Sequence, residues 1–125
     1  MSSRPLVLLV EDYADNRELV GAVLEAGGMS VAAAADGGAA TLLLDQGIRP
    51  DLLLVDIGLP NEDGYALMRR LRQDPRCAGA PLVALTSHAM RGDSERALAA
   101  GFDGYLTKPI EVATFAATVR AMLPG

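Results

Sequence analysis

Six polar residues stand directly after short apolar runs, where a chain of parallel strands would bring them together. They are Glu11, Asp12, Asp56, Thr86, Ser87 and Lys108. Three nearby carboxylates repel one another unless a cation joins them, and an all-oxygen set of this charge suits a hard ion such as Mg²⁺. Because Mg²⁺ commonly uses one or two carboxylates and keeps several waters, one acid stays free to act as an oxygen nucleophile.

Asp56 suits the role of nucleophile, because it stands alone between two apolar residues whereas Glu11 and Asp12 are adjacent. A phosphoryl group bound there needs its equatorial oxygens neutralised, and a hydroxyl, an ammonium and a metal ion are suitable partners. Thr86 and Lys108 supply the hydroxyl and the ammonium. The lysine is a point charge on a flexible stem, so it can follow the phosphoryl group to its final position.

The elements that must position these residues follow from the spacing of apolar side chains. Short apolar runs alternate with amphipathic segments, which predicts βα units and a parallel sheet. Strands are expected at 6–10, 29–35, 51–55, 81–85 and 104–106, and helices at 16–26, 38–46, around 66–71, 94–100 and 112–122. In such a sheet, residues just beyond the carboxyl ends of the strands gather along one edge.

Length and composition set the class of protein. A chain of 125 residues fits one domain, expected to span 1–125 with its core at about 5–123. A net charge of −5 disfavours direct nucleic-acid binding, and no apolar run reaches the length of a membrane span. The lone Cys77 cannot form an internal disulfide, and the first residues do not resemble a secretion signal. We therefore expect a cytoplasmic segment that contacts neither nucleic acid nor membrane.

The sequence resembles the receiver domains of two-component response regulators and hybrid histidine kinases. The resemblance spans nearly the whole chain and rests on four motifs in order. They are VED at 10–12, DIGLPNEDG at 56–64, LTS at 85–87 and YLTKP at 105–109. It implies a doubly wound, flavodoxin-like α/β fold, in which five helices flank a five-stranded parallel sheet of order 2-1-3-4-5.

The resemblance also implies a phosphorylation-dependent signalling switch, which is a phosphoacceptor and not a classical enzyme. Asp56 would take a phosphoryl group from a phosphohistidine on a histidine kinase or a histidine phosphotransfer domain, giving a labile mixed anhydride. By the same resemblance, Asp12, Asp56 and the backbone carbonyl of Gly58 would bind Mg²⁺ directly, and Glu11 would act mainly through water.

Two further residues are implied to transmit the switch. Thr86 would bond the phosphoryl oxygen and be drawn toward it, which vacates space for Tyr105 to turn inward. The surface of the fourth helix, fifth strand and fifth helix would change, and a downstream effector or an attached output domain would read it. Phosphorylation can favour the active form only by the interaction energy gained there. The bond between Lys108 and Pro109 is expected to be cis.

Each residue also has an ordinary structural explanation. Glu11 and Asp12 suit a solvated strand end and helix cap, and Asp56 suits the start of a turn. Thr86 and Ser87 taken alone favour a helix N-cap, and Lys108 suits an exposed loop cation. The joint placement of these residues after the predicted strands favours the site.

Two other functions remain open. A receiver-like scaffold that binds partners without phosphorylation typically lacks an acid, the threonine or the lysine, and here none is missing. An aspartate-nucleophile phosphatase of the haloacid dehalogenase pattern would carry a second Asp two residues after Asp56, where this chain has Gly58. The chain is expected to be either a stand-alone regulator or a segment of a larger protein.

Overall fold

The computed structural model describes residues 4–58, 63–86, 93–108 and 110–124. Within them, five parallel strands form one sheet in the order β2-β1-β3-β4-β5. The strands are β1 (Leu6–Val10), β2 (Ser30–Ala34), β3 (Leu52–Asp56), β4 (Leu82–Thr86) and β5 (Gly104–Thr107). The helices are α1 (Ala14–Ala26), α2 (Gly37–Asp45), α3 (Gly64–Gln73), α4 (Asp93–Ala100) and α5 (Val112–Ala121), with a 3-10 turn η1 (Pro75–Cys77). The expected fold class and strand order are confirmed.

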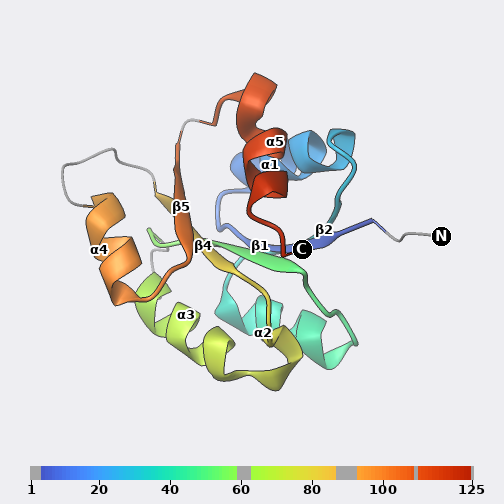
Figure 1. Ribbon diagram of the computed structural model, residues 1–125. Helices are drawn as coiled ribbons and strands as arrows, with labels where there is room; N and C mark the ends of the chain where they lie inside the picture. Colours follow the sequence, from blue (N-terminus) through green and yellow to red (C-terminus); the bar gives the residue numbers. More distant parts are fainter. Residues whose placement is uncertain (1–3, 59–62, 87–92, 109, 125) are drawn as a thin grey trace.

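Helices cover both faces of the sheet (Figure 1). α1 and α5 lie together on one face, and α2 and α3 lie on the other. Successive strand side chains point to opposite faces, so a strand buried on both sides needs an unbroken apolar run. Leu8 packs in the cluster that includes residues of α2 and α3, whereas Leu9 packs in the cluster that includes α1 and α5. This explains why β1 shows no alternation of polar residues.

The strand ends differ slightly from the expected bounds. Asp56 is the last residue of β3 and Thr86 the last residue of β4, whereas the apolar pattern predicts that each strand ends one residue earlier. The alanine-rich β2 forms in spite of weak β propensity, because its backbone pairs along its length with β1. The 3-10 turn η1 was not expected from the sequence.

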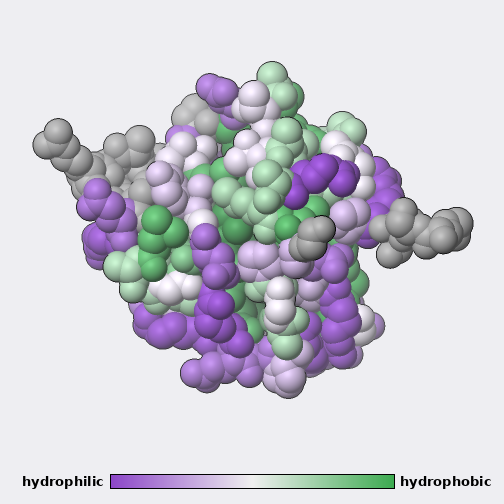
Figure 2. Space-filling view, in the orientation of Figure 1, coloured by the Kyte–Doolittle hydropathy of each residue, from purple (hydrophilic) through white to green (hydrophobic). Residues whose placement is uncertain are grey.

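The surface is uneven in polarity (Figure 2). Hydrophilic side chains dominate the part of this view over α2 and α3, whereas paler and more apolar surface surrounds α5. The exposed positions of α5 include Ala113, Ala117 and Ala121. Among the residues that the structure describes, no helix is long and apolar enough to span a bilayer.

Two aspartates close the amino edge of the sheet. The N–H of Asp51 donates to the carbonyl of Leu6 at 2.8 Å, and Asp51 Oδ2 accepts from the N–H of Leu6 at 2.8 Å. Asp103 makes the same two bonds with Leu82, each at 2.8 Å. Leu6 has no partner in β3 and Leu82 has none in β5, so these carboxylates take the place of a strand partner on that one side.

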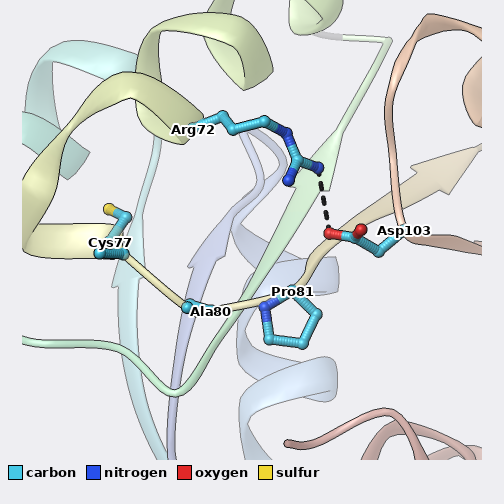
Figure 3. Close-up of a pocket in the computed structure, with 7 residues that line it drawn as sticks. Arg72, Cys77, Ala80, Pro81 and Asp103 are labelled. Atoms are coloured by element: carbon cyan, nitrogen blue, oxygen red, sulfur yellow. Dashed lines mark hydrogen bonds and ion pairs between the residues drawn. The ribbon is translucent and has the colours of Figure 1, made fainter.

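Arg72 adds an ion pair to the same edge (Figure 3). Its guanidinium reaches from α3 to Asp103 Oδ2 at 3.0 Å and donates to the carbonyl of Gly101 at 2.5 Å. Both side chains of the pair remain nearly half exposed and border a hollow of about 330 Å³. Cys77 lines this hollow but is 3% exposed, and burial raises the pKa of its thiol, so the reactive thiolate forms less readily. Arg72 thus ties α3 to the segment just before β5.

Candidate functional site

Strand register brings the acids together at the carboxyl edge of the sheet. Val10 of β1 pairs with Val55 of β3, so Glu11 and Asp56, the next residues of each chain segment, lie side by side. The backbone N–H of Glu11 donates to the carbonyl of Ala34 in β2 at 2.9 Å, which fixes the end of β1 between its neighbours. The two acids are 45 positions apart in the sequence and meet because β1 and β3 are adjacent in the sheet.

The three acids form one cluster. One carboxylate oxygen from each of Glu11, Asp12 and Asp56 lies within 4.8 Å of the others. Glu11 is 0% and Asp56 3% exposed, whereas Asp12 is exposed to solvent. The cluster therefore combines two acids withdrawn from water with one at the surface, so the site is open on the side of Asp12.

Lys108 joins the cluster from the position directly after β5. Its backbone N–H donates to the carbonyl of Thr86 at 2.7 Å, which holds the residue beside the end of β4. Its ammonium nitrogen lies 2.6 Å from Glu11 Oε1 and 2.9 Å from Asp56 Oδ2. Lys108 is therefore a partly buried cation shared by two acids, and the exposed loop cation considered from the sequence is wrong.

Burial and pairing act against each other on these groups. Burial raises the pKa of Glu11, and nearby Asp56 raises it further, while bonds from Lys108 and the N–H of Tyr13 lower it. Burial lowers the pKa of Lys108, but its bonds to Glu11 and Asp56 outweigh burial, so this pKa is raised. The lysine is consequently held in its charged form, whereas the glutamate ionises less readily than an exposed one.

Asp56 is fixed at both carboxylate oxygens. Oδ1 accepts a hydrogen bond from the backbone N–H of Gly58 at 2.8 Å, while Oδ2 faces Lys108. The chain packs tightly just beyond, because a Cβ at Gly64 would lie 2.6 Å from the Cα of Ile57. Only glycine lets the start of α3 approach the end of β3 so closely, which is the structural reason for the last residue of the second motif.

The donor set fits a divalent cation. All three acids offer oxygen ligands, which suits Mg²⁺. With the acids ionised, a single ammonium leaves two negative charges of the cluster uncompensated, and a dication matches that excess. The acidic cluster could therefore hold Mg²⁺.

Thr86 ends β4 with an unused hydroxyl. It is 2% exposed, and its Oγ1 finds no hydrogen-bond partner among the described residues. Because α4 begins at Asp93, seven positions later, Thr86 is not the N-cap of that helix. A buried hydroxyl without a partner is costly, so an acceptor that enters the site would satisfy it.

The other residues singled out from the sequence lie apart from the cluster or outside the described part. Tyr105 on β5 is 38% exposed, and within the described residues no hydrogen bond or ion pair links it to the acids. Ser87 and Pro109 lie outside the described residues, and so does the expected cis bond before Pro109. Part of the second motif, 59–62, lies outside them as well.

Sequence reasoning missed one residue at this edge. Arg17 of α1 donates from Nη1 to the backbone carbonyls of Glu11 and Asp12, at 2.9 and 3.2 Å. The only sequence signal is a basic residue five positions after Asp12. That signal is weak, because an arginine early in an amphipathic helix is ordinarily a solvated residue.

Comparison with known proteins gives one consistent answer. The family model "Response regulator receiver domain" matches residues 7–120. The chain is 37% identical over 117 residues to the polar-differentiation response regulator DivK of Brucella anthropi, covering 94% of both chains. It is 38% identical over 119 residues to the DNA-binding dual master transcriptional regulator RpaA of a Synechocystis strain, covering 95% of this chain and 49% of RpaA. The chain thus spans about half the length of RpaA.

Solved structures agree. The chemotaxis response regulator CheY4 of Vibrio cholerae aligns with a TM-score of 0.84 at 28% identity, over 97% of this chain and 100% of that one. The receiver domain of a histidine kinase from Syntrophus aciditrophicus aligns with a TM-score of 0.79 at 33% identity, over 95% and 89%. The chain therefore belongs to the response regulator receiver domain family, as the sequence motifs indicated. Its members are signalling domains of two-component systems, not classical enzymes, and typically bind Mg²⁺.

Proposed function

We propose that this chain is a phosphorylation-dependent switch in a phosphorelay, with Asp56 as the phosphoacceptor. One observation carries the proposal. Asp56 lies at a strand end with a carboxylate oxygen within 4.8 Å of those of two other acids, and a lysine ammonium 2.9 Å from its Oδ2. A nucleophile, a place for a metal ion and a cation for the phosphoryl oxygens thus occupy one site.

The proposed transfer starts from a phosphohistidine of a histidine kinase or a histidine phosphotransfer domain. A carboxylate oxygen of Asp56 forms a bond to phosphorus while the nitrogen–phosphorus bond breaks. The imidazole leaves with the electron pair of that bond, and the product is an acyl phosphate on Asp56. Lys108 lies close enough to Asp56 to keep its charge near the phosphoryl oxygens during the transfer. The chain catalyses only its own phosphorylation and dephosphorylation in this scheme.

Mg²⁺ is the proposed cofactor. Asp12, Asp56 and the backbone carbonyl of Gly58 would hold it directly, and Glu11 would act mainly through water. When bound, the ion supplies positive charge that offsets the carboxylates and the phosphoryl oxygens. The chain's own contribution is to hold the acids close together before the donor arrives.

Thr86 and Tyr105 are the proposed switch. The buried hydroxyl of Thr86 gains the acceptor it lacks when a phosphoryl oxygen enters, and this gain favours the phosphorylated conformation. Movement of Thr86 leaves space for Tyr105 to turn inward from its partly exposed position on β5. The surface of α4, β5 and α5 changes as a result, and an effector or an attached output domain reads it.

We further propose that residues 1–125 form a single receiver domain with its core at about 5–123, acting in the cytoplasm. The net charge of −5 and the absence of a helix able to span a membrane, within the part that the structure describes, support partners that are proteins. A histidine kinase or phosphotransfer domain would deliver the phosphoryl group, without direct contact of this segment to nucleic acid or membrane.

Intact-mass measurement tests the proposal. The protein is incubated with acetyl phosphate and Mg²⁺, and one phosphoryl group should be added. The gain should be absent with EDTA and absent in Asp56→Asn, which removes the nucleophilic oxygen. Asp51→Asn is the matched control, because Asp51 lies at the opposite edge of the sheet, and it should be phosphorylated like the wild type.

Two results would contradict the proposal. A folded wild-type protein that never gains mass with fresh donor indicates a receiver-like scaffold. Sustained release of phosphate from varied phosphate esters, with many turnovers per chain, indicates a phosphatase.

A further inference from the structure

Arg17 holds the backbone that carries two of the three acids. Its Nη1 donates to the carbonyl of Glu11 at 2.9 Å and to that of Asp12 at 3.2 Å. The side chain leaves α1 one turn after its start and is half-buried against the β1–α1 connection. A charged donor makes such bonds stronger than bonds between neutral groups.

The three carboxylates differ in how they are fixed. Glu11 accepts from the N–H of Tyr13 at 3.2 Å and pairs with Lys108, and Asp56 is held by Gly58 and the same lysine. Asp12 is exposed, and its carboxylate has no hydrogen bond or ion pair within the described residues. The position of the Asp12 carboxylate therefore depends on its backbone, and the guanidinium restrains the peptide groups on both sides of its Cα.

We infer that Arg17 is a positioning residue for the metal site: it sets the direction of the Asp12 carboxylate, and through it the affinity for Mg²⁺. The inference rests on the proposed function of the same site. Arg17 bonds to main-chain carbonyls and to no carboxylate of the cluster, so it acts through Asp12 and not on the phosphoryl group.

Charge and positioning predict opposite effects, which makes the inference testable. A guanidinium near three carboxylates repels an incoming dication, so removal of its charge alone would tighten Mg²⁺ binding. Removal of a group that positions a ligand weakens binding, typically by 10- to 100-fold for partners of metal ligands. The sign of the change in affinity therefore separates the two roles.

The experiment is calorimetric titration of the metal-free protein with MgCl₂ at fixed pH and ionic strength. Arg17→Gln should weaken Mg²⁺ binding about 10-fold. Arg17→Lys keeps the charge but lacks the planar guanidinium, and should weaken binding by a smaller factor. The expected order of affinity is wild type, then Arg17→Lys, then Arg17→Gln.

The chain offers a matched control in Arg49. Its Nη1 also donates to two backbone carbonyls, of Leu44 at 3.0 Å and Ile48 at 2.8 Å, between α2 and β3 and away from the acids. Arg49→Gln loses the same kind of bonds and the same charge, so it should lower thermal stability in EDTA while Mg²⁺ affinity stays at the wild-type value.

The outcomes are distinct. The inference is overturned if Arg17→Gln is folded by circular dichroism and binds Mg²⁺ as tightly as the wild type, or more tightly. If Arg17→Gln does not fold, Arg17→Lys decides, and unchanged affinity in that variant overturns the inference as well. A wild type that binds Mg²⁺ but gains no mass from acetyl phosphate refutes the proposed function alone. A wild type that binds no Mg²⁺ refutes both.

Discussion

Acidic side chains serve different purposes at the two edges of this sheet. At the amino edge, Asp51 and Asp103 each accept the N–H of a strand's first residue, and both stay exposed. At the carboxyl edge, Glu11 and Asp56 are buried beside each other. At the amino edge the carboxylates complete the backbone hydrogen bonds of the fold, whereas at the carboxyl edge negative charge is concentrated beyond what the nearby lysine neutralises.

The difference shows at which edge unfavourable interactions in the free protein would be relieved when a ligand binds. An exposed ion pair such as the one between Arg72 and Asp103 contributes little, because water screens it. Buried like charges are costly in the free protein, as is the Thr86 hydroxyl, which has no partner among the described residues, and a bound dication and phosphoryl group would relieve these costs. The amino edge, whose carboxylates are exposed and hydrogen-bonded, would gain no comparable free energy from a ligand.

The largest effect is expected from removing the cation at the carboxyl edge, and removing the cation at the amino edge provides the comparison. Lys108→Met leaves Glu11 and Asp56 buried without an ammonium, and should lower the free energy of unfolding by about 3 kcal/mol at pH 8 in EDTA. Arg72→Met at the exposed amino edge should lower it by less than about 1 kcal/mol. Urea unfolding measures both, and equal losses would show that burial does not distinguish the edges.

Mg²⁺ should stabilise only through the carboxyl edge. At a free concentration 100 times its dissociation constant, a ligand that binds the folded state alone adds about 2.7 kcal/mol. Asp12→Asn should lose most of this gain at the same Mg²⁺ concentration, because it weakens the site. Asp51→Asn should keep it. Thermal unfolding with and without MgCl₂ measures this stabilisation. If Asp12→Asn keeps the stabilisation by Mg²⁺, the metal binds elsewhere than at the cluster.

The pH dependence of stability should report on Glu11. Its pKa in the fold is raised above the ordinary value of 4.5, first by burial. Its contribution to stability is therefore complete below pH 4.5 and is lost as pH rises through the raised pKa, at about 1.4 kcal/mol for each unit of displacement. Urea unfolding in EDTA from pH 4 to 8 should show this fall.

Glu11→Gln should remove that fall, because glutamine does not ionise. Glu18→Gln, on the exposed surface of α1, is the matched control and should keep the wild-type profile. Parallel profiles for wild type and Glu11→Gln would contradict the expected titration of this residue.

The smallest effects are expected at the amino edge. Asp103→Asn keeps an oxygen that accepts from the N–H of Leu82 and loses only the exposed ion pair, which should cost less than about 1 kcal/mol. Asp103→Ala leaves that N–H without its side-chain acceptor and should cost about 1–2 kcal/mol. Both variants should gain mass from acetyl phosphate at the wild-type rate. A slower gain would show that the amino edge affects phosphorylation at the carboxyl edge.

Much of the fold is predictable from local pattern. The continuous apolar runs of β1, β3 and β4 reflect burial on both faces, so their type and order are readable without coordinates. The alanine-rich β2 is less readable, because its propensity is weak and pairing with β1 supplies the stabilisation. The η1 turn depends on the Asp74 carboxylate accepting the N–H of Arg76, a local bond that apolar spacing does not reveal.

For the candidate site, the sequence predicted that its acids and Lys108 would lie close together. Its members were identified by their position after strands, and the structure brings Glu11, Asp12, Asp56 and Lys108 together. The bonds among them were not predictable, because side-chain direction depends on packing between distant segments. Arg17 is the clearest case, since nothing in its own neighbourhood distinguishes it from a solvated helix residue.

The sequence by itself determined most of the secondary structure, the family and the candidate residues for the chemistry, because periodicity and motif order are local properties of the chain. Only the tertiary structure decided which charged groups form ion pairs with one another. Lys108 is 52 positions from Asp56 in the sequence. Their pairing depends on β4 lying between β3 and β5, and on the carboxyl ends of these strands meeting at one edge of the sheet. The physical reason is that burial and electrostatic coupling depend on distance in space, which strand order sets and local sequence does not.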